Sequence, residues 1–184
     1  MTTNYRDTLN LPETQFSMKA GLPQKEPEIL NFWNQNDIYK KIREKYSDSE
    51  LFLLHDGPPY ANGAIHLGHS VNKILKDITI KYKTLKGFNA PFIPGWDCHG
   101  LPIELNVEKK HGKNSELVQD KESFQKACKE YAETQINNQM DDFKRLGVFG
   151  DWENSYKSLD SSFEAEIIRS VSYTHLRAHE TLPY

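Results

Sequence analysis

The chain has 184 residues, of which 37% are hydrophobic and 27% charged, so it can form one globular domain or part of a larger protein. Its formal net charge of −3 provides no overall basic field, and a nucleic-acid partner would need local patches or protein outside this chain. Two cysteines that are far apart, Cys98 and Cys128, argue against a disulfide framework and a thiolate zinc site. The sequence shows no signal-peptide pattern and no apolar run near the roughly 18 residues of a membrane span, so we expect a cytoplasmic protein without membrane contact.

The first 50 residues are expected to form an N-terminal arm and a helix. Residues 1–26 are polar and irregular, and Pro27 suits the first turn of a helix that continues to Tyr46. The apolar residues of this segment lie close to helical spacing: Ile29, Leu30, Trp33, Ile38, Ile42 and Tyr46.

A strand, a loop, a helix and a second strand are predicted next. Leu51–Leu54 is a continuous apolar run ended by Gly-Pro-Pro, which predicts a strand buried on both faces of a parallel sheet. Apolar residues at helical spacing predict a helix from Val71 to Leu85. Asn89–Pro94 is a second strand candidate, weakened by its prolines. This order is typical of the start of a doubly wound α/β domain, whose ligands bind beyond the carboxyl ends of the strands.

Two unusual stretches follow the predicted strands. They are His55–His69, HDGPPYANGAIHLGH, and Gly95–Glu104, GWDCHGLPIE. Glycine and proline disfavour an ordinary helix or strand, so both stretches are predicted to be shaped loops. Because both follow strands of one parallel sheet, they should meet at the same edge of that sheet.

The C-terminal third is predicted to be helical from Lys121 to Leu146 and again from Phe163. The last fourteen residues, 171–184, continue the second helix poorly because its apolar stripe ends there. We expect them to be a tail foreign to the native sequence; an ordinary frayed terminus is the alternative.

The pair His66 and His69 indicates an anion site. The two residues are three apart at the opening of a helix, so both imidazoles should face one way. A helix N-terminus adds partial positive charge and free N–H groups, which suit a polyphosphate. Gly68 has no side chain, so a flat ring can lie against the backbone there. Gly57 and the two prolines after it should stiffen the approach.

Two other interpretations of these histidines stay open at this point. Four histidines, His55, His66, His69 and His99, fall within 45 residues and could bind a metal, but no HExxH or CxxC accompanies them. They could also be merely structural, since short motifs often occur by chance.

Asp97 is the candidate for binding an amine. It follows a predicted strand and lies between two glycines, where a partly desolvated carboxylate needs a cationic partner such as a substrate ammonium group. An aspartate that merely forms a turn is the alternative.

These residues resemble a known family. Residues 57–69, GPPYANGAIHLGH, resemble the first signature of class I aminoacyl-tRNA synthetases, His-Ile-Gly-His, with Leu67 in the second place. Residues 95–104 are similar to the isoleucine-specific branch, and residues 9–27 resemble the N-terminal arm of its bacterial members. The resemblance runs from about residue 5 to residue 169.

The resemblance implies a fold and a reaction. Residues 51–170 would be a partial Rossmann-like catalytic domain, the first half of the synthetase core. With ATP and Mg²⁺, the isoleucine carboxylate attacks the α-phosphate, giving isoleucyl-adenylate and pyrophosphate. The amino acid then passes to the terminal ribose of tRNA(Ile). Such a protein is expected to be a monomer.

The resemblance also implies roles for individual residues. His66 and His69 would be catalytic and stabilise the triphosphate, and Gly68 would lie by the adenosine. The other implied site residues are Asn62 and Gly63 for ATP, Gly57 and Pro58 for the isoleucine, and Asp97 for its ammonium group. No metal ligand is implied here, since the family's zinc cysteines lie outside this chain.

Several of the family's parts are missing from the sequence. We find no Lys-Met-Ser-Lys-Ser loop, no editing insertion and no anticodon-binding helices. We therefore expect an N-terminal piece that does not catalyse the reaction alone. The alternatives are a non-catalytic nucleotide-binding domain and a histidine-ligated metal hydrolase.

Overall fold

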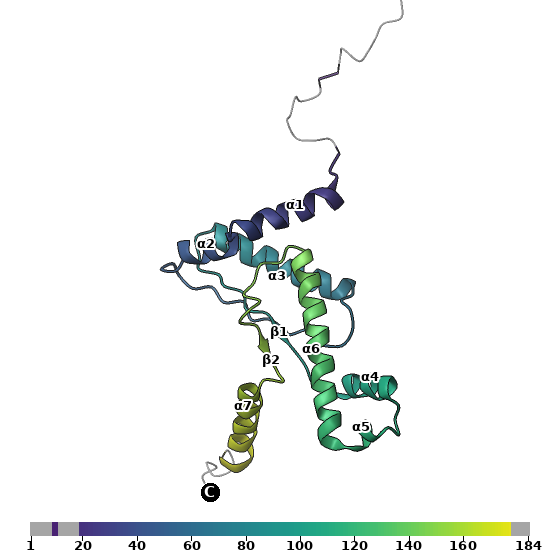
Figure 1. The fold of residues 1–184 in the computed structure, drawn as a ribbon. Coiled ribbons are helices and arrows are strands. Elements are labelled where there is room, and N and C mark those ends of the chain that lie inside the picture. The colour runs from purple at the N-terminus through teal and green to yellow at the C-terminus, as the bar shows by residue number, and fades with distance from the viewer. Residues whose placement is uncertain (1–8, 11–18, 178–184) are drawn as a thin grey trace, which may run out of the picture.

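The computed structural model describes residues 9–10 and 19–177 and is mostly helical, with a small parallel sheet (Figure 1). Most of the predicted N-terminal arm and residues 178–184 lie outside the described residues. Among the residues that are described, no helix has the length and apolar character needed to cross a membrane. The elements are α1 (Leu22–Gln35), α2 (Ile38–Lys45), α3 (Leu67–Leu85), β1 (Gly95–Trp96), α4 (Leu101–His111), α5 (Glu116–Gln119), α6 (Lys121–Arg145), β2 (Tyr156–Lys157), α7 (Ser161–Ser172) and a π-helical turn, η2 (Tyr173–Arg177).

The sheet is parallel but short, and the strands predicted at Leu51–Leu54 and Asn89–Pro94 do not form: Leu51 and Asn89 pair only in a single bridge. β1 pairs with β2, with Gly95 opposite Tyr156. On the other side of this segment, single parallel bridges join Leu51 to Asn89 and Tyr60 to Asp97. Residues 89–97 therefore lie between residues 51–60 and β2. Prolines in this stretch have no N–H to donate, so they interrupt the ladder.

The segment Leu51–Leu54 differs from its prediction. Phe52 and Leu54 pack against a buried cluster that includes Ile80 of α3, whereas Leu51 and Leu53 are 56% and 66% exposed. The expectation of two buried faces was therefore wrong, because within residues 9–10 and 19–177 no segment covers the second face.

Two boundaries also differ from the sequence expectations. The helix predicted from Pro27 begins earlier, at Leu22, and is divided into α1 and α2 near Asp37, whose φ of 49° is left-handed. The stretch Gly95–Glu104 is not all loop, since it begins with β1 and ends in the first turn of α4. The helices expected in residues 71–85, 121–146 and from residue 163 are confirmed as α3, α6 and α7.

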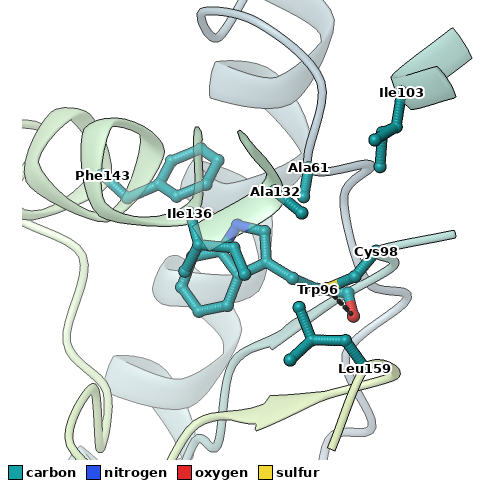
Figure 2. Close-up of a cluster of buried hydrophobic side chains, with 8 residues drawn as sticks. All are labelled: Ala61, Trp96, Cys98, Ile103, Ala132, Ile136, Phe143 and Leu159. Carbon is teal, nitrogen blue, oxygen red and sulfur yellow. Dashed lines mark hydrogen bonds between the residues drawn. The ribbon is translucent and has the colours of Figure 1, made fainter. Parts of the chain in front are cut away.

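The main core lies where α6 supports the loops of the sheet. Figure 2 shows Trp96 of β1 surrounded by buried side chains from distant segments, among them Ala61, Ile136 and Phe143. Helices α4 and α5 pack beside α6 (Figure 1). The loop that contains Ala61 is therefore anchored to the same core as the strand that precedes Asp97.

Helix α3 has an unusual distribution of side chains. Three of its four buried residues are polar: Lys73, Asp77 and Thr84. Apart from the buried Ile80, its large apolar residues are exposed and form a stripe along the helix: Leu67, Val71, Ile74, Leu75, Ile78, Tyr82 and Leu85.

Candidate functional site

The histidine pair forms the start of α3. His66 is the N-cap residue, and its Nδ1 accepts the N–H of Gly68 at 3.1 Å. The N–H of His66 in turn donates to Nδ1 of His69 at 3.3 Å. The two rings are stacked, with centroids 3.9 Å apart and planes 24° apart. The three-residue spacing therefore brings both imidazoles together, as predicted.

The hydrogen bonds also define what the pair can donate. Because each Nδ1 accepts a backbone N–H, the proton of each neutral ring lies on Nε2. Burial, followed by the neighbouring charges of His66 and Lys73, lowers the pKa of His69 below its usual value. At neutral pH this ring is therefore an uncharged donor.

These histidines open on a cavity of about 370 Å³. It brings together His66 and His69, predicted for the triphosphate, with Gly57 and Pro58, two of the three residues predicted for isoleucine. Its lining consists of Gly57, Pro58, Pro59, Tyr60, His66, Gly68, His69, Asn72, Lys73 and Phe143. No carboxylate is among them, and both imidazoles lie there at the N-terminus of α3, where N–H groups can donate to an anion. Phosphate groups fit this lining.

Gly68 packs closely against the ring of His66. A Cβ built on it would lie 2.9 Å from Cε1 of His66. The flat ring against this glycine is therefore the His66 imidazole itself.

Asp97 joins the second loop to the first. Its N–H donates to the carbonyl of Pro59 at 2.9 Å, and its carbonyl accepts the N–H of Ala61 at 2.7 Å. The two unusual stretches thus meet at one edge of the sheet, as the sequence predicts. The expectation of a partly desolvated carboxylate was wrong, because Asp97 is exposed and lies outside the cavity lining. Oδ1 accepts the N–H of His99 at 3.4 Å, which is the bond of the turn-forming alternative.

Asn62 and Gly63 shape the loop rather than line the cavity. Oδ1 of Asn62 accepts Nδ2 of Asn106 at 2.6 Å and the hydroxyl of Tyr131 at 3.1 Å. The carbonyl of Gly63 accepts Nε2 of Gln139 at 2.9 Å, and its φ of 82° favours glycine.

The four histidines of the metal interpretation do not gather. The ring of His55 stacks on Tyr156, and Nε2 of His99 is 3.0 Å from the carbonyl of Ser158. Across residues 9–10 and 19–177, no group of three or more His, Cys, Asp or Glu side chains could hold a metal ion.

A buried charged cluster next to the cavity escaped the sequence analysis. The Asp56 carboxylate forms ion pairs with Lys73 and, at 2.5 Å, with Lys76. The available signal was the helical spacing of His69, Lys73 and Lys76, which places both lysines on the side of α3 that carries this histidine.

Comparison with known proteins defines the class. A family profile described as "tRNA synthetases class I (I, L, M and V)" matches residues 28–178. The chain therefore belongs to the class I tRNA synthetase family.

Within that family, the chain is similar to proteins named isoleucine–tRNA ligase. Those of Francisella philomiragia subsp. philomiragia and of Francisella tularensis subsp. mediasiatica and subsp. novicida are each 59% identical to it over 170 residues. The matches cover 92% of this chain and 18% of each relative, so the chain spans about a fifth of their length. They confirm the predicted resemblance to the isoleucine-specific branch.

A solved structure supports the fold. It is a ternary complex described as LeuRS-tRNA-LeuAMS from Agrobacterium radiobacter K84, with a TM-score of 0.64. The match covers 86% of this chain and 18% of that chain. Its sequence identity of 18% shows a shared fold only.

Proposed function

We propose that this chain carries the ATP- and isoleucine-binding half of the catalytic site of an isoleucine–tRNA ligase. The whole protein would activate L-isoleucine with ATP and transfer it to tRNA(Ile). The carrying observation is the stacked pair His66 and His69 at the N-terminus of α3, facing a cavity whose lining includes Gly57 and Pro58.

The geometry supports a donor role for both histidines in the first step of the reaction. The isoleucine carboxylate attacks the α-phosphorus of ATP, and the bond to pyrophosphate breaks. The two Nε2–H groups donate to phosphate oxygens whose negative charge increases in the transition state, and the dipole of α3 acts in the same direction. Mg²⁺ would enter with the phosphates.

The remaining roles are proposed from the resemblance of residues 57–69 and 95–104 to the signatures of the family. Gly57 and Pro58 would line the isoleucine side chain, and the exposed Asp97 carboxylate would hold the ammonium group. Gly68 would lie next to the adenosine, and the loop shaped by Asn62 and Gly63 would contact ATP.

The organisation of the chain belongs to the same proposal. We propose an N-terminal arm and helix in residues 1–50, a partial Rossmann-like catalytic domain in residues 51–170 and a foreign tail in residues 171–184. The whole protein would act in the cytoplasm as a monomer.

ATP–pyrophosphate exchange that depends on isoleucine tests this function in the whole protein. His66→Ala should lower the exchange rate about 100-fold, the size expected for one lost transition-state donor, with little effect on isoleucine binding. Asp97→Ala should mainly weaken isoleucine binding. His111→Ala, an exposed histidine at the end of α4, is the matched control and should leave exchange unchanged.

Three outcomes would contradict the proposal. Equal and small effects of His66→Ala and Asp97→Ala would refute the assigned roles. Nucleotide binding without any isoleucine-dependent exchange by the whole protein would favour a non-catalytic nucleotide-binding domain. Robust exchange by the 184-residue chain alone would refute the expectation that it is only part of the site.

A further inference from the structure

Asp56 is a buried residue that connects four segments of the chain. It is 1% exposed, and its carboxylate contacts Lys73 and Lys76 of α3. Oδ2 also accepts the N–H of Gly95 in β1 at 3.1 Å. Its own carbonyl accepts the hydroxyl of Tyr156 in β2 at 2.7 Å. One residue therefore connects the first loop, α3 and both strands of the sheet.

The ion pair of Asp56 and Lys73 links two walls of the cavity. Asp56 directly precedes Gly57, which begins the wall proposed for isoleucine. Lys73 lies one helical turn after His69 and itself lines the cavity. Nζ of Lys73 is also 5.4 Å and 5.3 Å from the ring centroids of Phe92 and Phe143. The ammonium group is thus confined from several sides and cannot reach a substrate without leaving Asp56.

Stability alone gives a weak reason for this cluster. Desolvating two charges costs about as much as their attraction returns, so well-packed apolar residues often serve equally well. Burial lowers the pKa of Lys73, and the charge of Asp56 opposes that shift. What the ion pair provides beyond packing is a directional, fixed connection between the loop and the helix.

We propose that Asp56 is a positioning residue for the activation step, setting the separation between the Gly57–Pro59 wall and the His66–His69 wall through its ion pair with Lys73. This inference rests on the proposed function. The attacking carboxylate and the α-phosphorus must approach to within about 3–3.5 Å, and a misplacement of about 1 Å lowers the rate about 100-fold. In the proposed site, ATP would bind mainly to the His66–His69 wall and the isoleucine side chain mainly to the Gly57–Pro59 wall. A change in their separation therefore lowers the rate of reaction while leaving the binding of each substrate largely intact.

The test measures kinetics in the whole protein. Asp56→Asn keeps the size of the side chain and an acceptor for Gly95, but it removes the charge that holds Lys73. We expect kcat for isoleucine-dependent exchange to fall about 100-fold, while KM for isoleucine and for ATP changes less than threefold. Lys76→Met removes the more exposed partner and should lower kcat less than tenfold.

A second variant separates positioning from folding. Asp56→Asn alone leaves Lys73 buried without its counter-ion, which can prevent folding. The double variant Asp56→Asn with Lys73→Met removes both charges, and it should recover thermal stability without recovering kcat.

Two results would overturn the positioning role. One is a folded double variant with kcat within threefold of the parent, and the other is a parallel loss of kcat and of substrate binding. Either result differs from failure of the proposed function, because in that case the unmutated protein itself would show no isoleucine-dependent exchange.

Discussion

The buried amide of Gln139 on α6 supports the loop that carries the site. It is 0% exposed and satisfies three groups at once. Its Oε1 accepts Nε1 of Trp96 at 3.0 Å, and its Nε2 donates to the carbonyls of Tyr60 and Gly63, each at 2.9 Å. Gln139→Leu keeps the approximate volume and removes all three hydrogen bonds.

The expected loss of stability follows from these partners. The fully buried indole N–H of Trp96 would remain unpaired, at a cost of about 2 kcal/mol. The two carbonyls belong to half-buried residues, Tyr60 and Gly63, and would cost about 1 kcal/mol each. Burying the apolar leucine offsets roughly 1 kcal/mol of this. The net loss is about 3 kcal/mol, or a melting temperature roughly 9 °C lower for a chain of this size.

Thermal unfolding of the 184-residue chain, followed by circular dichroism, measures this loss. Gln125→Leu provides the control, since Gln125 is exposed on the same helix, and it should change the melting temperature by less than 2 °C, or about 0.5 kcal/mol. A loss below about 1 kcal/mol for Gln139→Leu, or one equal to that of Gln125→Leu, would refute the reasoning.

Two further predictions concern stability. In Gly95→Ala, the new Cβ would lie 2.0 Å from Cζ of Tyr156, so we expect urea unfolding to show a free energy of unfolding lower by about 3 kcal/mol. Gly57→Ala is the control because a Cβ has room there, and equal urea midpoints for the two variants would contradict the clash. The pKa of His69 is lowered in the folded state, so protonation of this ring favours the unfolded state. The contribution of His69 to the free energy of unfolding is therefore complete above the unfolded pKa of about 6.5 and is lost as the pH falls through the folded pKa. The urea midpoint should therefore fall between pH 7 and pH 5, and less so in His69→Asn, which keeps an acceptor for the N–H of His66; an identical fall in both proteins would show that His69 is not responsible.

The histidine pair could be placed from the sequence because its geometry is local. His66 and His69 immediately precede an apolar repeat, and the spacing of residues on one helix determines how their rings lie. The meeting of the two loops also followed from local order, since two strands that run parallel must end at the same edge. This argument places the backbone of Asp97 but not the solvent exposure of its carboxylate.

The charged cluster could not be predicted with the same means. Asp56 and its lysines are 17 and 20 residues apart in the sequence, and only the packing of α3 on the sheet brings them together. The four residues Leu51–Leu54 likewise contain no alternation that would reveal a half-exposed segment. Whether a face is covered depends on elements elsewhere in the molecule, which periodicity within one segment does not describe.

Helix α3 reverses the usual arrangement of a surface helix, since Lys73 and Asp77 are buried and a line of aliphatic side chains is exposed to water. Its outward side chains include Leu75 and Ile78, 60% and 56% exposed. In an isolated preparation such a line attracts hydrophobic dyes, resins and other copies of the chain as the concentration rises. Charged substitutions at Leu75 and Ile78 would improve the colloidal behaviour of the sample while leaving the buried side of the helix untouched.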